Sequence, residues 1–403
     1  MDGGKKNKGI ERKRVKLDDS TRAFQWNKLF MSTLGLWPAK PSDFLFSVTF
    51  GYFCYEMVLE YIDLLLFIDD LEHVILNLTE NVAFTELLVR MITMRLYIRE
   101  FGQLISKATR DIEENKYNDE ERKVLIAYHK KSKLYMKLLV INTGITATSY
   151  YAKPLLEQFG EIVEYFGSQK NENTTFIFLL PYRFHTFYEL NDASTYFWTY
   201  LSQLPFLYIS WMSQSASDCL MVALVYHVSG QIAVLATRIT NIDTDPSKCT
   251  KQLHDVVRSQ ARLLRMGRII EKAFSAMLLS QLMGGTILIC ILGYQILACL
   301  ANGERAILIS LVSYIILVLL ILYAYCSIAE TLITESTRLC EAYYNCKWYD
   351  MVGKNAKIII FCMARSQKPL QLTAGKFSVF CLTTFTNTVK ASMGYLSVLR
   401  TVM

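Results

Sequence analysis

Seven long apolar runs constrain the fold of this chain more than any other feature of its sequence. A helix that crosses a bilayer needs roughly 20 mostly apolar residues, and each run meets that length. The runs are continuous rather than alternating, which favours helices over the strands of a membrane β-barrel. We therefore predict an all-α membrane protein with seven transmembrane helices, at about 43–67, 74–98, 133–152, 194–214, 273–299, 306–329 and 377–402.

The composition agrees with this class. Charged residues make up only 20% of the 403 residues, whereas soluble domains usually carry about 25%. The basic segment Met1 to Arg22 contains no apolar stretch, so we expect no cleavable signal peptide. The net charge of +7 comes from basic residues in the connections between runs, a distribution typical of loops near anionic lipid. Nucleic acid is not an expected partner.

Loop charge predicts the orientation of the chain. Lys and Arg are concentrated in the N-terminal segment and in the second, fourth and sixth connections, whereas the other connections are poor in them. Basic loops stay on the cytoplasmic side, so the N-terminus is expected to be cytoplasmic and the C-terminus extracellular. The sequon at Asn173 falls in a predicted outer connection and is the glycosylation candidate. A second sequon, at Asn77, is expected to lie too close to the membrane for use.

The apolar periodicity continues beyond the expected membrane thickness. Ser215 to Ile239 and Gln252 to Lys272 extend the fourth and fifth helices, and Glu341 to Arg365 is expected to form a cytoplasmic helix rather than an eighth span. Extensions of helices four to six would form a cytoplasmic anchor bundle. The arginines Arg258, Arg262 and Arg265 share one face, which fits either a solvated surface or a bundle that holds subunits together.

The predicted domains follow from these runs. They are a cytoplasmic N-terminal segment (1–42), helices one to four, which form a ligand-binding bundle with part of helix six (43–214), cytoplasmic extensions (215–272), helices five and six (273–329), a cytoplasmic anchor (330–374) and a pore-lining last helix (377–403).

No enzymatic constellation can be read from the sequence. The ten cysteines show no CxxC pair, and the five histidines form no HExxH motif. We expect no catalytic residue, no metal and no cofactor. Three acids, Glu56, Glu60 and Asp63, share one face of the first run and are expected to pair within the bundle.

The last run carries a small and polar stripe on one helical face. Its members are Thr384, Asn387, Ala391, Gly394, Val398 and Val402. Small residues allow close helix packing, but the stripe also fits the wall of a pore with a hydrophobic constriction at its two valines. The pattern alone leaves both interpretations open. A cation in the wall would repel permeant cations, so Lys390 is expected to turn toward a carboxylate or a backbone carbonyl.

Several motifs resemble those of the insect odorant receptors. They are Leu34-Gly35-Leu36-Trp37-Pro38, Asp218 to Leu235, Tyr344 to Tyr349, Lys368 to Phe377, Thr384-Phe385, Lys390-Ala391-Ser392 and Tyr395 to Arg400. The resemblance covers nearly the whole chain and is most specific at its C-terminal end. It is closer to a tuning subunit than to the co-receptor, which carries a longer insertion between the fourth and fifth helices.

This resemblance implies a function. Such subunits assemble with co-receptor subunits as heterotetrameric, non-selective cation channels in the plasma membrane of sensory neurons, surrounded by membrane lipid, and a volatile organic ligand opens them to permeant cations. The last helices line the pore. Val398 and Val402 then correspond to the hydrophobic gate, Thr401 lies beside a polar pore position, and Asn387, Ala391 and Gly394 line the pore. Ala391 stands where relatives often have Thr.

The resemblance also implies a ligand pocket in the outer half of the membrane, among helices two, three, four and six. A pocket for a small volatile should be mostly apolar with a few polar groups. From the predicted topology the candidates are Phe84, Leu88, Thr146, Ser149, Tyr150, Tyr196, Tyr200, Gln203 and Tyr314. Each of them also fits ordinary packing between helices.

Three other classes of protein have features that can be compared with this sequence. A gustatory-receptor-like channel would carry a Thr-Tyr motif in its last helix, which this chain lacks. A G-protein-coupled receptor would have an external N-terminus, opposite to the prediction from loop charge. A secondary transporter would show an internal repeat or interrupted helices at corresponding positions.

Overall fold

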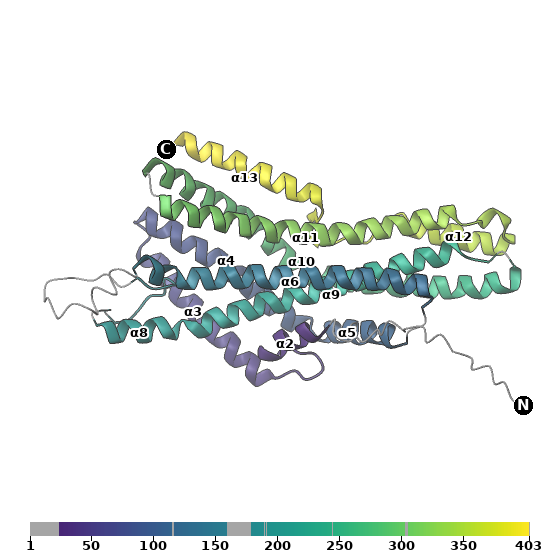
Figure 1. The fold of residues 1–403 in the computed structure, drawn as a ribbon, viewed down its shortest axis with the longest axis horizontal. Helices are drawn as coiled ribbons and strands as arrows, with labels where there is room; N and C mark the ends of the chain where they lie inside the picture. Colours follow the sequence, from purple (N-terminus) through teal and green to yellow (C-terminus); the bar gives the residue numbers. More distant parts are fainter. Residues whose placement is uncertain are drawn as a thin grey trace, which may run out of the picture.

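The protein is described by a computed structural model that covers residues 24–114, 117–158, 179–188, 190, 192–243, 245–302 and 305–402. These residues form an elongated helical bundle, with α12 at one end and the C-terminus of α13 near the other (Figure 1). In chain order the elements are α2 (Gln25–Thr33), α3 (Asp43–Leu66), α4 (Leu71–Leu96), α5 (Ile98–Glu113), α6 (Asp119–Glu157), α8 (Ala193–Ser202), α9 (Leu204–Thr240), α10 (Pro246–Asn302), α11 (Arg305–Asn345), η2 (Trp348–Asp350), α12 (Gly353–Ser366), β1 (Thr373–Ala374), β2 (Ser378–Val379) and α13 (Leu382–Val402).

The prediction of an all-helical protein is confirmed, since helices account for most of each of the seven apolar runs. By length and composition alone, the described residues contain three helical segments suited to crossing a membrane, at Ala193–Thr240, Pro246–Leu300 and Leu308–Asn345. The remaining runs lie in α3, α4, α6 and α13, whose charged and polar residues lower their hydropathy. The seven-span topology and the orientation of the termini stay predictions.

The fourth run contains a break that the sequence analysis did not predict. Helix α8 ends at Ser202 and α9 begins at Leu204, with Pro205 in its first turn. Proline lacks a backbone N–H and is favoured in the first turn of a helix, which is where Pro205 lies. From that point α9 runs to Thr240, which confirms the predicted extension. Helix α10 likewise includes the predicted extension Gln252 to Lys272 without interruption.

The segment before the last helix corrects one expectation. A single helix was predicted over Glu341 to Arg365, but α11 continues to Asn345, a short 3₁₀ turn follows, and α12 begins at Gly353. Gln260 of α10 joins these parts, because its amide donates to Ser366 Oγ at 2.7 Å and its oxygen accepts from the Tyr343 hydroxyl at 3.0 Å. Helix α12 therefore folds back against α10 and α11.

The start of the last helix is also later than predicted. Residues 377–381 were assigned to it, but Thr373–Ala374 and Ser378–Val379 pair as an antiparallel hairpin instead. Gly375 and Lys376 form its turn with φ of +56° and +67°, a left-handed conformation that glycine adopts without strain. A β-carbon on Gly375 would also lie 2.7 Å from Leu279 of α10. The hairpin thus closes against α10, and α13 begins at Leu382.

Helix α5 was not predicted and lies outside the apolar runs. It buries Phe101, Leu104 and Ala108 at helical spacing while its other face is polar. Phe101 packs on Phe274 of α10 with ring centroids 5.1 Å apart. Near its C-terminal end, Asp111 pairs with Arg262, one of the three arginines that share a face of α10.

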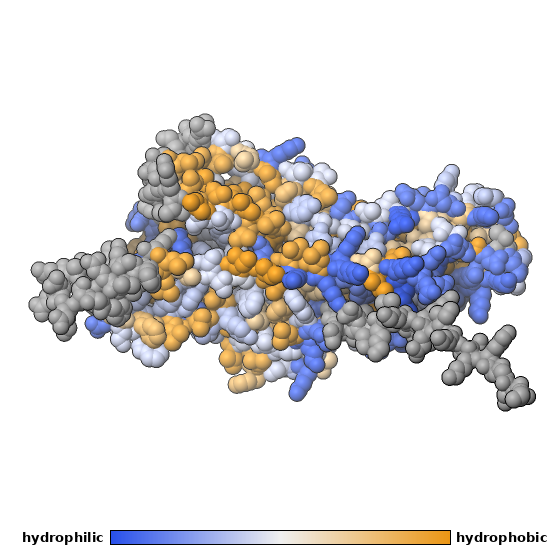
Figure 2. All heavy atoms as spheres, viewed as in Figure 1, coloured by the Kyte–Doolittle hydropathy of each residue, from blue (hydrophilic) through white to orange (hydrophobic). Residues whose placement is uncertain are grey.

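The surface of the bundle is divided along its length. Figure 2 shows hydrophobic side chains gathered over the part where α13 lies, whereas hydrophilic side chains cover the end where α12 lies. Helix α9 runs through the centre of the bundle, and every residue from Ser215 to Ala236 is buried. An apolar zone next to a polar zone is the pattern expected of a helical bundle that is only partly in lipid.

Candidate ligand-binding cavity and surface of the last helix

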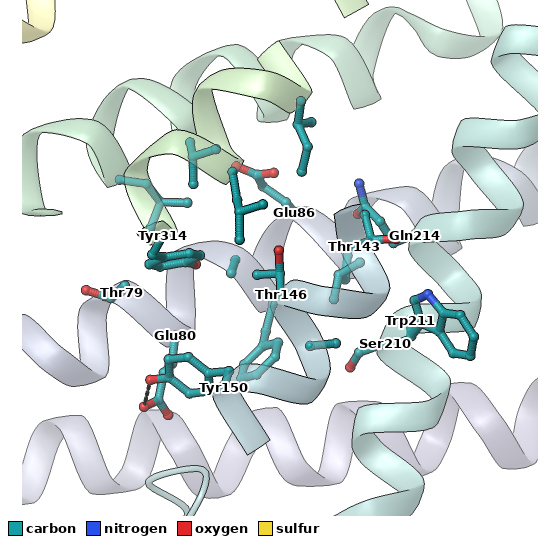
Figure 3. Close-up of a pocket in the computed structure, with 18 of the residues that line it drawn as sticks. Thr79, Glu80, Glu86, Thr143, Thr146, Tyr150, Ser210, Trp211, Gln214 and Tyr314 are labelled. Atoms are coloured by element: carbon teal, nitrogen blue, oxygen red, sulfur yellow. Dashed lines mark hydrogen bonds between the residues drawn. The ribbon is translucent and has the colours of Figure 1, made fainter. Parts of the chain in front are cut away.

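A cavity of about 170 Å³ lies inside the apolar part of the bundle, between α4, α6, α9, α10 and α11 (Figure 3). An apolar cavity of about 150 Å³ accommodates a molecule the size of benzene, so this one suits a small ligand. Its walls combine aliphatic and aromatic side chains with a few polar ones. The lining residues are Thr79, Glu80, Ala83, Phe84, Glu86, Leu87, Thr143, Thr146, Ala147, Tyr150, Tyr182, Leu207, Ser210, Trp211, Gln214, Gln281, Leu288, Tyr314, Leu317, Val318 and Ile321.

Four of the nine ligand-binding candidates lie on this lining, namely Phe84, Thr146, Tyr150 and Tyr314. They come from α4, α6 and α11, helices far apart in the sequence. Tyr150 and Tyr314 face each other with ring centroids 6.5 Å apart. The structure therefore brings these four side chains to one small space.

The other five candidates do not line the cavity. Leu88 packs against the hydrophobic core, Ser149 bonds to its own helix, and Tyr196 and Tyr200 donate to backbone carbonyl oxygens elsewhere. Gln203 has a supporting position. Its side-chain oxygen accepts from the Tyr182 N–H at 3.1 Å and its amide donates to the Tyr182 carbonyl at 3.2 Å. Gln203 thus fixes the backbone of a residue that does line the cavity.

One side of the cavity ends in a paired acid. Glu80 accepts a hydrogen bond from the Tyr150 hydroxyl and pairs with Arg183 at 2.8 Å. The backbone N–H of Arg183 also donates to Glu80, at 3.1 Å. Because each oxygen of this buried carboxylate has a donor, Glu80 ties the segment that contains Arg183 to α4.

A fully buried ion pair lies behind the opposite wall. Arg90 of α4 pairs with Asp218 of α9 at 2.8 Å, and their side chains are 0% and 1% exposed. The guanidinium also donates to Tyr325 at 2.9 Å and to Gln281, while Gln214 donates to Asp218 at 3.1 Å. Gln214 and Gln281 are themselves part of the cavity lining. The cavity and the ion pair therefore share a wall.

A second acid of α4, Glu86, lines the cavity without a partner. Its residue is 8% exposed, and Oε1 accepts no hydrogen bond within the described chain. Figure 3 places it across the cavity from Glu80 and Tyr150. The sequence analysis missed both Glu86 and Arg90. The signal was available, since charged residues one helical turn apart inside an apolar run usually mark a functional site.

The acids of the first run are only partly paired. Asp63 bonds to His73 at 2.6 Å and accepts from the Asn77 amide at 2.9 Å, as expected. Both oxygens of Glu60 lack a hydrogen-bond partner in the described part of the chain. Asn77 is fully buried, so its amide is inaccessible to glycosylation, while Asn173 lies outside the described residues.

The stripe on α13 faces away from the rest of the subunit. Asn387, Ala391 and Gly394 are exposed, and nothing lies within 4 Å of a β-carbon added at Gly394. The face that packs on α10 contains Thr388 and Ser392, which are buried. Packing within the subunit therefore does not account for the stripe. The side chains of Val398, Thr401 and Val402, the gate candidates, lie outside those described.

Lys390 lies beside the stripe, and its outcome differs from the expectation. The residue is exposed and forms no ion pair within the described residues. It was expected to turn toward a carboxylate or a carbonyl group of the same bundle. Within the described residues the expected partner is therefore not found.

The remaining reactive side chains are dispersed. All ten cysteines are free thiols, and no group of three His, Cys, Asp or Glu side chains in the described ranges is arranged to hold a metal ion. The chemistry concentrated at one place is therefore that of the cavity. A long apolar bundle, a mostly apolar cavity among its helices and an exposed small and polar stripe on the last helix are together the features of a helical membrane receptor.

The comparisons with known proteins identify the family. The family model for the 7tm odorant receptors matches residues 70–393, and the chain belongs to this family. Odorant receptor 13a of Drosophila melanogaster is 25% identical over 356 residues, 80% of each chain. The odorant receptor coreceptor of Harpegnathos saltator is 28% identical, but over only 38% of this chain and 33% of its own length. These matches confirm a tuning-type subunit rather than a co-receptor, and a receptor rather than an enzyme.

The fold agrees with a solved structure. The olfactory receptor OR5 from Machilis hrabei, in complex with eugenol, superimposes with a TM-score of 0.76 at 17% identity, covering 96% of this chain and 100% of that one. At this level of identity the match concerns the fold. It supports the arrangement of helices around the cavity and the separate position of α13.

Proposed function

We propose that this chain is the odorant-binding subunit of a ligand-gated, non-selective cation channel, and that a small volatile organic molecule opens it from the cavity. The observation that carries the proposal is the cavity itself. It is mostly apolar and sized for one small molecule, and such cavities are the usual sites for ligands of this kind. The solved relative holds eugenol, a small aromatic compound, which fits a ligand of similar size here.

Two helices connect the cavity to α13. Helix α10 contributes Leu288 to the cavity and, one turn further on, contacts α13 through Gly293, beside which Leu396 packs. Helix α11 contributes Tyr314 to the cavity, and its Tyr323 packs on Phe385 of α13 with ring centroids 5.7 Å apart. A ligand that binds better when these helices are displaced would favour a second position of α13.

The exposed stripe of α13 supports a pore. In a tetramer with co-receptor subunits, the faces that carry Asn387, Ala391 and Gly394 would meet around a central path. Val398 and Val402 would form its hydrophobic constriction with Thr401 beside them, since such rings block ions by excluding water. The N-terminus would be cytoplasmic, the C-terminus extracellular, and the polar end around α12 would be the cytoplasmic anchor. The setting is the plasma membrane of a sensory neuron, with lipid around the bundle.

The test is electrical recording from cells that express the full chain together with a co-receptor. A panel of small volatiles should evoke cation currents in these cells and none in cells that express the chain alone. Substituting Phe84, which packs in the cavity wall, with Trp should fill the cavity and suppress the currents at normal surface expression. Currents that persist undiminished in Phe84→Trp would place the ligand elsewhere.

The gate has its own test. Replacing Val398 with Ser should raise the current in the absence of ligand, because a polar ring no longer excludes water. Met393, which is exposed off the stripe, provides the matched control, and Met393→Ser should leave the basal current unchanged. An unaltered basal current and ion selectivity in Val398→Ser would contradict the gate assignment.

A further inference from the structure

Two polar groups of the cavity wall, Oε1 of Glu86 and the Ser210 hydroxyl, have no hydrogen-bond partner within the described residues, and only the first belongs to a carboxyl group. Glu86 is 8% exposed, lines the cavity, and its Oε1 accepts no hydrogen bond within the described residues. The other carboxyl group on the lining, that of Glu80, is held by Arg183 and Tyr150. A buried acceptor without a donor is costly, so the site gains free energy when a donor arrives.

The guanidinium groups near the cavity pair with other carboxylates, although Nε of Arg90 has no acceptor within the described residues. Arg90, one turn from Glu86, is bound to Asp218, Ser217 and Tyr325, and no ion pair links it to Glu86 within 4 Å. The hydroxyls of Thr143 and Thr146 donate to carbonyl oxygens of their own helix, at 2.9 and 2.8 Å. Within the described residues, no donor therefore reaches Oε1 of Glu86.

The neighbouring helix provides room for this carboxyl group. A β-carbon added at Gly284 of α10 would lie 1.9 Å from Glu86 Oε1, far inside van der Waals contact. Gly284 lies between Gln281 and Leu288, which line the cavity one turn away on either side. The absence of a side chain at position 284 thus allows the carboxyl group to rest on the cavity wall.

We propose that Glu86 selects ligands that carry a hydrogen-bond donor, namely small cyclic alcohols and phenols, over isosteric ethers and hydrocarbons. This inference rests on the proposed function and names the ligand class of its site. The donor binds Oε1 while the ring occupies the apolar space beside Phe84 and Leu317. A site built to bond a hydroxyl group discriminates strongly against an analogue that lacks it, because its own polar group is then left unpaired.

The experiment uses the full chain with a co-receptor and a panel of cyclic alcohols and phenols, each with its methyl ether and parent hydrocarbon. For the intact chain, half-maximal currents should require about ten- to hundredfold less of the hydroxyl compound than of its ether, the range expected when a buried polar group of the site is left without its hydrogen bond. In Glu86→Leu that preference should disappear. The matched control Glu113→Gln, an exposed acid of α5, should keep it.

A second variant tests the proposal even if Glu86→Leu fails to fold. Gly284→Ala retains the carboxyl group and displaces it, and it should reduce the preference at least severalfold with normal surface labelling. Equal responses of the intact chain to alcohol and ether, or a preference that survives in Gly284→Ala and Glu86→Leu, would overturn the inference and leave the proposed function intact. No current with any member of the panel would count against the proposed function instead.

Discussion

The side chain of Leu396 on α13 packs directly on Gly293 of α10. A methyl group added at Gly293 would lie 3.1 Å from both Cδ atoms of Leu396, a distance at which the neighbour must move. Five residues before Gly293, Leu288 lines the cavity. This contact connects a helix of the cavity wall with the last helix.

Gly293→Ala should therefore weaken the response to ligand. The added methyl separates α10 from α13, and substitutions along such contacts change coupling by about 0.5–2 kcal/mol, or about two- to thirtyfold in half-maximal concentration. Dose–response currents measure the shift. Adding Leu396→Ala should restore the response, since it removes the clashing atoms. Gly51→Ala, with nothing within 4 Å, is the control, and an equal shift there would contradict the explanation.

The Arg90–Asp218 pair should be essential for stability. Asp218→Asn leaves a buried guanidinium without its counter-charge, and breaking a buried pair typically costs about 3–5 kcal/mol. Asp43→Asn breaks the pair with Arg95 at a carboxylate that is 81% exposed, where the cost is about 0–1 kcal/mol. Melting temperature of the purified protein and surface expression should both fall for Asp218→Asn only. Equal melting temperatures would show that Asp218 is protonated or paired otherwise.

Asp111 should make the protein sensitive to acid but not to mild changes of pH. Burial raises the pKa of Asp111, but a hydrogen bond from His227 and the charge of Arg262 outweigh it, so the pKa lies below its usual value. A carboxyl group of this kind stabilises the fold above its unfolded pKa of about 4 and loses that contribution as the pH falls through the folded value.

The same sign holds for Glu121, where burial is outweighed by the hydrogen bonds and charge of Arg238. The titration of Asp111 and Glu121 should therefore leave the melting temperature unchanged between pH 5 and 8. Below about pH 4, where both carboxylates take up protons, the melting temperature should fall. Asp111→Asn should lower the melting temperature between pH 5 and 8 and should make its decrease below about pH 4 less steep. If the melting temperature of Asp111→Asn decreases below about pH 4 as steeply as that of the intact protein, Asp111 does not cause the sensitivity to acid.

Glycosylation tests the predicted topology. Asn173 should carry a glycan if residues 153–193 are extracellular, so Asn173→Gln should abolish the mobility shift on enzymatic deglycosylation. Asn77 is fully buried, and its amide donates to Asp63, so Asn77→Gln should leave the shift in place while reducing surface expression. A protein with no glycan at Asn173 but an externally accessible N-terminal tag would reverse the proposed orientation.

Much of the fold followed from local sequence. The seven apolar runs predicted the long helices, because a period of 3.6 and a length of roughly 20 residues depend on neighbouring residues alone. The first apolar helix begins at Asp43 as predicted, and α9 continues beyond Ser215 as predicted. Helix ends were less accurate, since the hairpin before α13 depends on contacts of Gly375 with Ser275 and Leu279, almost 100 residues away in the chain.

The candidate site followed from the sequence only in part. Four of nine proposed cavity residues line the cavity, because topology restricts which helical turns are near one another but not which way each side chain turns. Tyr196 and Tyr200 turn toward backbone carbonyl groups. Glu86 was missed, since its lack of a partner is a property of four surrounding helices.

The sequence by itself determined the class of protein, the helical runs and the stripe on the last helix, since these depend on composition and periodicity. It left that stripe equally suited to packing and to a pore. Only the tertiary structure decided that Thr388 and Ser392 pack on α10 while Asn387, Ala391 and Gly394 face outward. The reason is physical: periodicity sorts residues into faces, whereas the partner of each face depends on residues remote in the chain.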